Sequence, residues 1–309
     1  MPKPYISLRP FIPWRQMPHP LDWDLVFERQ APLQVEIGFG NGEHLVRRAA
    51  REPGLNLLGI DVSWPSVRRA LRKIALARVE NVRVIQAGAS PALTRLFSAG
   101  AISGVEALFP RPWPSRRHRK YRLFSRDFQR LLNNRLCPGG KVRMVTDHQQ
   151  YAAWSLGQSR GAEFSASLVR KGPGLDTKYE RKWLGQGQEE FYELLLIKAG
   201  HVEMPANREA AVQVYRLGHF QPRAFPLGPH QGEITVIFKD KLHDPEQERT
   251  LVRALVLEED VTQSVWLEFR REQGQWELRL APGCGAIPTL GLQHTIRLAR
   301  DLATNNVKQ

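Results

Sequence analysis

The sequence predicts an α/β protein with a doubly wound, mostly parallel sheet, followed by a smaller C-terminal α+β domain. Between residues 33 and 200, short apolar segments alternate with segments of helical periodicity. This alternation is typical of right-handed crossovers and of a parallel sheet covered on both faces. After residue 203, apolar residues alternate with polar ones, which indicates antiparallel strands. We therefore divide the chain into an N-terminal segment 1–32, a domain 33–200 and a domain 205–309.

The first 32 residues are rich in proline and aromatic residues and show no clear periodicity, so we expect an extended segment that lies over another surface. No apolar run is long enough to span a bilayer, and the first residues lack the apolar core of a signal peptide. Cys137 and Cys284 are too few for a disulfide framework or a zinc cluster. We expect a cytoplasmic protein with reduced thiols, without a metal and without a membrane partner.

The first domain is expected to contain five pairs of a strand and a helix. The strands fall in residues 33–40, 56–63, 81–88, 104–110 and 141–147, and the helices in residues 43–52, 66–79, 91–100, 125–136 and 151–160. A further apolar strand in residues 189–200 can close the sheet. The charged stretch 176–183 that precedes it is expected to be a solvated loop.

In the C-terminal domain, residues 264–280 predict a hairpin that turns between Glu272 and Gln275. One face of this hairpin would carry Val265, Leu267, Phe269, Trp276, Leu278 and Leu280. Another strand is expected at 233–239, and helices at 247–260 and 290–303. No motif in this domain indicates a chemistry.

The net charge of +14 is unevenly distributed along the chain. From His201 onward there are 13 Lys and Arg against 14 Asp and Glu, which leaves 32 against 17 in residues 1–200. A polyanion such as a nucleic acid is therefore the expected partner, and the first two thirds of the chain should bind it.

The stretch "VEIGFGNGEHL" is the first chemical signal. Glu36 ends a strand, and glycines follow at every second position, at Gly38, Gly40 and Gly42. Glu43 stands where a dinucleotide fingerprint needs its third glycine, so a pyrophosphate is disfavoured. Asp61 ends the next strand, where an acidic residue can bind both hydroxyls of a ribose. Together these residues favour S-adenosylmethionine over NAD, although a purely structural turn would show the same glycines.

A second signal is the position of several residues at the carboxyl ends of predicted strands. Glu36, Asp61, Asp147 and the stretch 109–113 all fall there, at the edge where open parallel sheets bind ligands.

The stretch "LFPRPWPSRRHRKYR" joins three prolines to six Lys and Arg, without a carboxylate. We expect the prolines to build a rigid wall at the end of a strand, with Trp113 either stacked on an extruded base or packed beneath it. The cations after it, Arg116, Arg117, Arg119, Lys120 and Arg122, are expected to bind a nucleic-acid backbone.

Five motifs between Leu33 and Lys198, in a specific order and spacing, resemble the bacterial tRNA (guanine-N7)-methyltransferases. They are "VEIGFGNGE", "GIDVS", "LFPRPWPSRRH", "MVTDHQQYA" and "TKYER". The resemblance implies a Rossmann-like class I methyltransferase that uses S-adenosylmethionine to methylate N7 of a guanine in the variable loop of tRNA. Some members of this family also carry an extra C-terminal region.

The motif match and the residue chemistry together give a set of expected site residues. The cofactor-binding set is Glu36, Gly38, Gly40, Gly42, Asp61 and Gly88. The substrate-binding set is Trp113, Arg116, Arg117, Lys120, Asp147, Thr177, Lys178 and Glu180. Asp147 and Glu180 are also the expected catalytic residues.

Three positions depart from the family pattern. Arg111 stands where the family has the aspartate of Pro-Asp-Pro-Trp, Gly88 replaces an aspartate after the third strand, and Ser115 replaces a lysine. Guanine N7 has a lone pair and no proton to lose, so its methylation needs alignment and charge stabilisation but no general base. Because an arginine inside the site would repel a sulfonium, we expect Arg111 to point outward, towards phosphate.

Three functions remain open on the sequence. The favoured one is an active tRNA guanine-N7 methyltransferase with a rearranged site, acting as a monomer or a homodimer. The others are a catalytically impaired tRNA-binding relative of the same family, and a methyltransferase of another RNA or another base. The retained glycine turn and Asp61 favour activity, whereas Gly88 and Arg111 favour the impaired relative.

Overall fold

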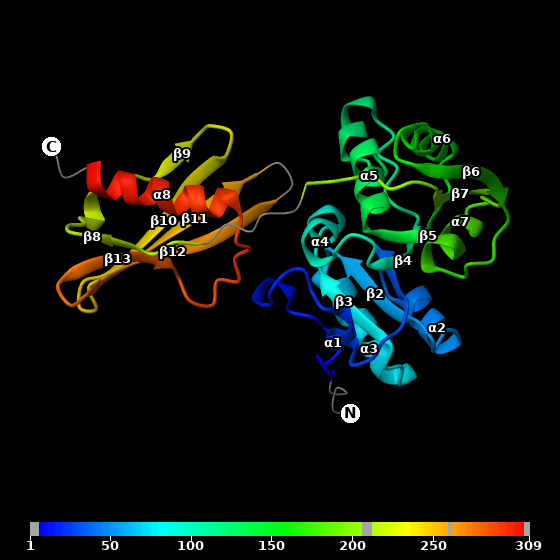
Figure 1. Cartoon of the computed structure of the whole chain (residues 1–309), viewed down its shortest axis with the longest axis horizontal. Coiled ribbons are helices and arrows are strands. Elements are labelled where there is room, and N and C mark those ends of the chain that lie inside the picture. Colours follow the sequence, from blue (N-terminus) through cyan, green and yellow to red (C-terminus); the bar gives the residue numbers. More distant parts are fainter. Residues whose placement is uncertain (1–5, 206–211, 259–260, 306–309) are drawn as a thin grey trace. The chain divides into compact units, whose positions relative to one another are not determined.

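The computed structural model describes residues 6–205, 212–258 and 261–305. The chain divides into two units, Met1–Pro205 and Ala206–Gln309, each built on its own sheet (Figure 1). In the described residues, no helix is both long enough and apolar enough to cross a membrane.

The first unit contains a seven-stranded sheet with the order β3-β2-β1-β4-β5-β7-β6. Its strands are β1 (Leu33–Ile37), β2 (Asn56–Asp61), β3 (Val82–Gln86), β4 (Ile102–Leu108), β5 (Leu136–Thr146), β6 (Phe164–Lys171) and β7 (Phe191–Lys198). Strands β1 to β5 are parallel, and β7 is antiparallel to both β5 and β6. The strand order reverses between β1 and β4, so their carboxyl ends open a crevice there. The predicted doubly wound α/β fold is confirmed.

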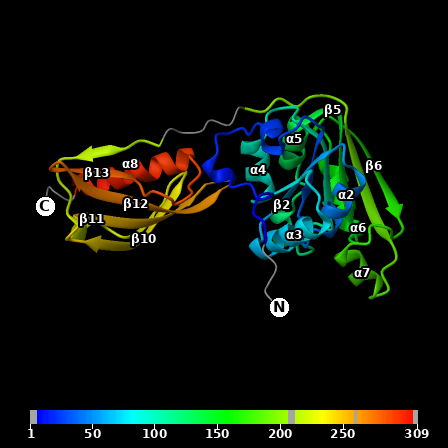
Figure 2. The same cartoon turned by 90° about the horizontal axis from the view of Figure 1, so that it is seen from below.

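Helices cover both faces of this sheet, since its central parallel strands carry apolar side chains on both faces. They are α2 (Glu43–Arg51), α3 (Trp64–Ala77), α4 (Ala89–Leu96), α5 (Arg126–Arg135), α6 (Gln149–Gln158) and α7 (Lys178–Leu184). On one face, Leu45 of α2 and Val67 of α3 pack with Leu57 of β2. In Figures 1 and 2, α4 lies on the opposite side of β2 from α2. The central strands therefore sit between two layers of helices.

The N-terminal segment runs along β3, at one edge of the sheet. It contains a short 3₁₀ helix (Trp14–Gln16) and α1 (Trp23–Phe27), and Phe11 forms a bridge with Val84. The indole N–H groups of Trp14 and Trp23 donate to the carbonyl oxygens of Gln86 (3.1 Å) and Leu96 (3.2 Å). Both rings are buried, so the aromatic residues of this segment attach it to the core.

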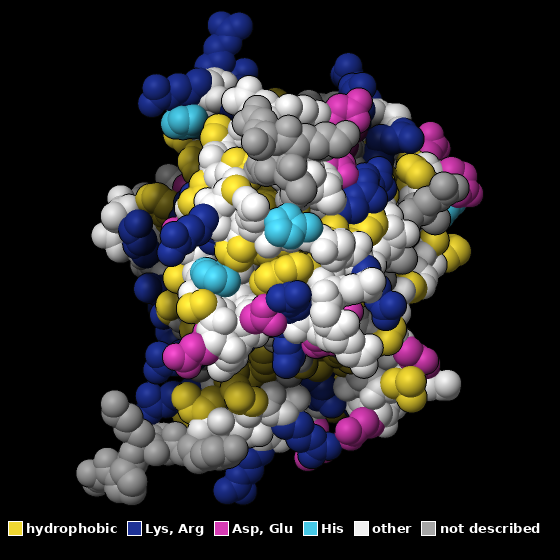
Figure 3. All heavy atoms as spheres, turned by 90° about the vertical axis from the view of Figure 1, so that its left-hand side faces the viewer, with side chains coloured by type: hydrophobic (Ala, Val, Ile, Leu, Met, Phe, Trp, Pro, Cys, Tyr) yellow, Lys and Arg dark blue, Asp and Glu magenta, His cyan; other side chains and the backbone are white. Residues whose placement is uncertain are grey.

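The second unit is a six-stranded antiparallel sheet with the order β8-β13-β12-β11-β10-β9. Its elements are β8 (Tyr215–Leu217), a 3₁₀ helix (Pro222–Ala224), β9 (Gly228–His230), β10 (Thr235–Asp244), β11 (Arg249–Leu257), β12 (Thr262–Glu272), β13 (Gln275–Leu280) and α8 (Leu290–Asn305). The predicted hairpin is confirmed, since Glu272 pairs with Gln275. Leu292 and Ile296 of α8 pack on one face of the sheet. Figure 3 shows charged side chains of both signs among hydrophobic ones on the side of this unit that it presents.

Two of the predicted local structures are wrong, and one strand of the first sheet was not predicted. Residues 249–257, expected in a helix, form β11, which pairs with β10 on one side and β12 on the other. The stretch 176–183, expected to be a loop, contains most of α7. Strand β6 was not predicted, because its burial alternates at the edge of the sheet without an apolar run.

Away from α8, the second sheet carries a buried carboxylate. Glu268 is 1% exposed and accepts hydrogen bonds from Arg279 (2.7 Å) and from Arg249. Burial acts to raise the pKa of Glu268, but the hydrogen bonds from Arg279 and Arg249 outweigh it and leave that pKa below its ordinary value.

Replacing Glu268 by Gln should destabilise the second unit by about 1.5 to 3 kcal/mol at neutral pH, because two charge-assisted hydrogen bonds are lost. A carboxyl with a lowered folded pKa stabilises the protein above its unfolded pKa and loses that effect as the pH falls through its folded pKa. The difference between wild type and Glu268→Gln should therefore shrink below pH 4.5, the ordinary value. Urea unfolding at several pH values measures it, and a difference independent of pH would contradict this account.

Candidate active site

The glycine turn after β1 takes a backbone shape that most residues avoid. Gly38, Gly40 and Gly42 have φ values of 74°, 58° and 75°. At Gly42 a Cβ atom would also lie 2.7 Å from the Cβ of Ala70 in α3. The glycine there lets α2 begin directly against α3.

Asp61, at the end of β2, ties the glycine turn to the start of α3. Its carboxylate accepts the backbone N–H of Gly40 (2.9 Å) through one oxygen and that of Ser63 (2.8 Å) through the other. Each oxygen keeps a lone pair for a further donor such as a ribose hydroxyl.

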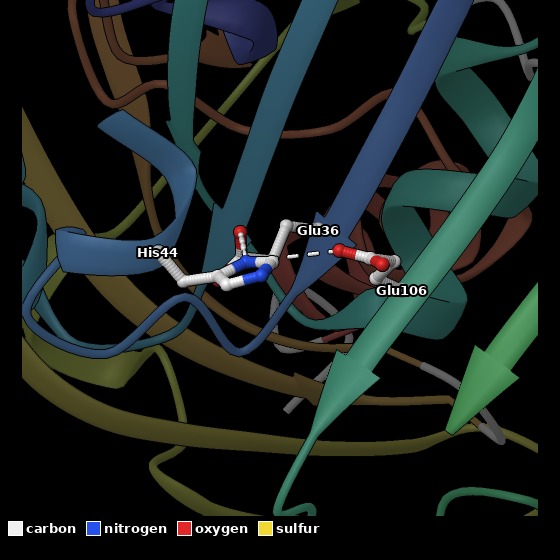
Figure 4. Close-up of side chains that lie close together, drawn as sticks. All are labelled: Glu36, His44 and Glu106. Carbon is white, nitrogen blue, oxygen red and sulfur yellow. Dashed lines mark hydrogen bonds and ion pairs between the residues drawn. The ribbon is translucent and has the colours of Figure 1, made fainter. Parts of the chain in front are cut away.

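Glu36 is 3% exposed and lies beside a second acid, Glu106, which is partly buried (Figure 4). His44, in the first turn of α2, donates from Nδ1 to Glu36 (3.1 Å) and lies 3.6 Å from Glu106 of β4. Glu106 also accepts hydrogen bonds from Arg48 and Arg143, both at 3.1 Å. Both guanidinium groups bond to Glu106 and not to Glu36, and their positive charges beside the cluster disfavour a divalent metal among its three side chains.

The charge of Arg48 is held firmly in this network. Burial acts to lower the pKa of Arg48, but the hydrogen bond to Glu52 and the negative charges of Glu106 and Glu36 raise it overall. The guanidinium therefore stays charged and keeps α2 attached to the strands below it.

A cavity of about 260 Å³ opens above this cluster. It is lined by Glu36, Gly38, Phe39, Gly40, Asn41, Glu43, His44, Ser66, Arg69, Leu108, Phe109, Thr177, Lys178 and Tyr179. The lining comes from the glycine turn, the starts of α2 and α3, the end of β4 and the start of α7. A mostly uncharged turn with a buried acid at its base fits the amino-acid end of S-adenosylmethionine, whose ammonium needs an anion.

The segment "TKYER" forms the far wall of this cavity. Thr177 caps α7, since its hydroxyl accepts the N–H of Glu180 (3.1 Å). Glu180 is 2% exposed, and its carboxylate accepts the N–H groups of Gly174 (2.9 Å), Leu175 (3.0 Å) and Asp176. The carboxylate of Glu180 is therefore bonded to its own loop, and Glu180 does not line the cavity.

The proline-rich loop leaves the end of β4 with an unusual backbone. Phe109 and Trp113 have positive φ values of 54° and 43°. The Trp113 ring packs against His118 and Tyr121, with centroids 5.7 and 5.6 Å away. Arg111 is exposed and lies over the Trp113 ring, with its guanidinium carbon 5.7 Å from the centroid. Arg111 does not line the cavity, and its outward direction towards phosphate stays a prediction.

The basic residues of the loop divide into two groups. Arg116, Arg117 and Lys120 are exposed on a 3₁₀ helix (Arg116–Tyr121), where Lys120 lies over Tyr121. Arg122 is 5% exposed, donates to the carbonyl of Pro112 (2.8 Å) and lies against the rings of Tyr151 and Trp154. The prediction that Arg122 binds phosphate is wrong, because it is buried as the anchor of the loop.

The remaining predicted residues lie near the same sheet edge. Asp147 follows β5, is half-buried, and has no hydrogen-bond or ion-pair partner for its carboxylate in the described part of the chain. Gly88 precedes α4 with an ordinary φ of −70°, and a Cβ atom there would meet Pro91 at 3.1 Å. Of the predicted residues, Glu36, Gly38, Gly40, Thr177 and Lys178 line the cavity, and the others do not.

The sequence did not single out His44, Arg69 or Tyr179, which also line the cavity. A histidine in the first turn after the glycines was the available signal for His44. Tyr179 gave none, because its position depends on how α7 packs against the glycine turn.

Known proteins are similar to the first unit, and one relative covers nearly the whole chain. A family model described as "Putative methyltransferase" matches residues 30–193. The tRNA (guanine-N(7)-)-methyltransferase of Thermotoga maritima is 31% identical over 295 residues, which cover 90% of this chain and 91% of that protein. That of Chlorobium phaeobacteroides is 42% identical over 173 residues, 55% of this chain and 84% of that protein. The crystal structure of the 16S rRNA methyltransferase KamB covers 58% of this chain and 93% of its own, with a TM-score of 0.46 and 14% identity.

Replacing Gly42 by Ala should cost about 1 to 2 kcal/mol for the left-handed backbone, and more for the contact with Ala70. Gly157, in α6, is the control, since a Cβ atom there meets nothing within 4 Å and its φ is not positive. Gly157→Ala should stabilise the protein by about 0.5 to 1 kcal/mol. The midpoints of denaturant unfolding measure the stability of each variant relative to wild type. If both variants change the stability equally, the turn does not require the left-handed backbone at Gly42.

Proposed function

The chain belongs to the tRNA (guanine-N7)-methyltransferase family, and on this basis we propose that it transfers the methyl group of S-adenosylmethionine to N7 of a guanine in the variable loop of tRNA. The observation that carries the proposal is the meeting of the glycine turn, Glu36 and Asp61 at the crevice between β1 and β4. The exposed cations of the proline-rich loop follow β4 from the same crevice.

Glu36 and Asp61 are the proposed cofactor-binding acids. The buried carboxylate of Glu36 borders the cavity and offers a negative charge to an ammonium group. Asp61 offers its remaining lone pairs to ribose hydroxyls, and the glycines let the ligand approach the backbone. When bound, the cofactor supplies a methyl group on a positively charged sulfur.

Asp147 is the proposed partner of the guanine. Its carboxylate is half-buried and unpaired within the described residues, at the carboxyl end of β5. It can accept hydrogen bonds from the amide and amino groups of the base and stabilise the positive charge that arrives at N7. Since N7 carries no proton, no side chain needs to act as a general base.

For Glu180 we propose a positioning role instead of direct catalysis. Its carboxylate is bonded to three N–H groups of the loop that precedes α7, so it shapes the wall formed by Thr177 and Lys178. In the same way, Arg111 acts outside the reaction centre, beside Trp113, where a tRNA phosphate can reach it.

Turnover tests the proposal directly. Wild-type protein incubated with tRNA and S-adenosylmethionine labelled in the methyl group should yield labelled 7-methylguanosine, detected by mass spectrometry of the nucleosides. Asp147→Ala should lower turnover at saturating tRNA by about 10²-fold or more, because a preorganised charge is removed. Asp127→Ala, an exposed aspartate of α5, is the matched control and should leave turnover unchanged. Absence of labelled product from wild type would indicate the catalytically impaired relative.

The salt dependence of binding tests where tRNA lies. Replacing Arg116, Arg117 and Lys120 by Ala should flatten the plot of log affinity against log salt by up to about three units. The control triple, Arg223, Lys239 and Arg297 to Ala, removes the same charge from exposed positions of the second unit. If the control flattens the slope as much as the test triple, the RNA surface has been misplaced.

A further inference from the structure

Two arginines attach the segment around α7 to the start of α2. Arg47 of α2 donates to the Asp176 carboxylate (2.7 Å) and to the carbonyl of Leu175 (2.6 Å). Arg181 of α7 donates to the same carboxylate (2.7 Å) and to Glu43 of α2 (2.6 Å). We refer to Glu43, Arg47, Asp176 and Arg181 as the α2–α7 latch.

The segment held by this latch is stiff in itself. The carboxylate of Glu180 accepts hydrogen bonds from the N–H groups of residues 174–176, and Thr177 caps the N-terminus of α7. Asp176 has a positive φ of 47°, a conformation that Asp and Asn tolerate better than most residues. Leu175 and Trp183 of this segment also pack in a hydrophobic cluster on the sheet, so when the latch opens we expect residues 174–184 to move together about that contact.

What the latch holds in place is one wall of the cavity. Thr177, Lys178 and Tyr179 all line it, and Cε2 of Tyr179 lies 4.0 Å from where a Cβ atom of Gly40 would be. The centroid of the Tyr179 ring is 6.4 Å from that of Phe109, on the side of β4. Tyr179 thus reaches from α7 to the glycine turn.

We propose that Arg47 and Arg181 are positioning residues that keep residues 174–184 closed over the cofactor cavity, and that the ion pairs of the latch open to release the cofactor. The inference rests on the proposed function, because it takes the ligand of this cavity to be S-adenosylmethionine or its demethylated product. The latch contacts join two segments that are 129 residues apart in sequence. Breaking them should therefore change how α7 packs against α2, and not the stability of either helix by itself.

The solvent exposure of the latch suits it to repeated opening. The side chains of Arg47 and Glu43 are 29% and 28% exposed, and those of Arg181 and Asp176 are 48% and 64% exposed. Exposed ion pairs are individually weak and are screened by salt. Two arginines that share the Asp176 carboxylate therefore hold residues 174–184 closed by ion pairs weak enough to break and re-form.

The test compares Arg47→Ala with Arg51→Ala, which removes an exposed arginine from the last turn of the same helix. In ligand-free protein, amide hydrogen exchange in residues 174–184 should be about fivefold to tenfold faster in Arg47→Ala and unchanged in Arg51→Ala. Dissociation of S-adenosylhomocysteine, followed by stopped flow, should accelerate by the same factor.

Asp176→Asn is a second test of the latch. Asparagine tolerates the positive φ of this position as aspartate does, but it lacks the negative charge that both arginines share. It should accelerate both processes in wild type and add little when Arg47 is already Ala, because both changes break one latch. High salt should accelerate wild type towards the rates of the variants.

The outcomes separate the latch from the proposed function. Exchange and dissociation rates of Arg47→Ala and Asp176→Asn equal to those of Arg51→Ala would overturn the latch. If wild type fails to bind S-adenosylhomocysteine while exchange in residues 174–184 responds as expected, the latch stands and the cofactor assignment fails.

Discussion

A buried carboxylate and a partly buried one, on adjacent parallel strands, set the constraint on which the site depends. Glu36 of β1 and Glu106 of β4 are directly paired in register. Like charges opposite one another destabilise a sheet, and buried charges are costly unless they are compensated. The compensation comes from His44 and Arg48 on α2 and from Arg143 on β5. Arg143 also forms an ion pair with Glu193 of β7. These charge contacts, together with the apolar packing of Leu45 and Val46, hold α2 against the strands beside the glycine turn.

The same helix connects this buried charge to the surface. One side of α2 faces the carboxylates through His44 and Arg48, and another presents Glu43 and Arg47 to the segment around α7. The floor of the cavity and its movable wall are thus attached to one rigid element. The proline-rich loop has a comparable division, with Arg122 buried among aromatic rings and Arg116 and Arg117 left in solvent.

Most of the first sheet was predictable from the sequence because strands buried on both faces give continuous apolar runs. Residues 249–257 were mispredicted because "RTLVRALVL" is apolar at a period of two and also at a helical period, and only its pairing with β10 and β12 decides. Around the site, the strand-end acids were predictable, since strand ends are visible in the sequence. The burial of Arg122 and the contacts of Glu180 and Tyr179 were not, because they depend on which distant segments pack against them. The roles of Gly88 and Asp147 stay predictions.

The way the N-terminal segment lies along β3 has a consequence for solubility. An edge strand with free N–H and C=O groups is a template on which another chain can add a strand and start aggregation. Two backbone hydrogen bonds occupy part of that edge: the N–H of Ile12 donates to the carbonyl of Val84, and the N–H of Val84 donates to the carbonyl of Pro10. At the opposite edge, β6 carries Arg170 and Lys171, whose charges disfavour the approach of a second strand. The first unit thus protects the edges of its sheet in two ways, by covering one and by charging the other.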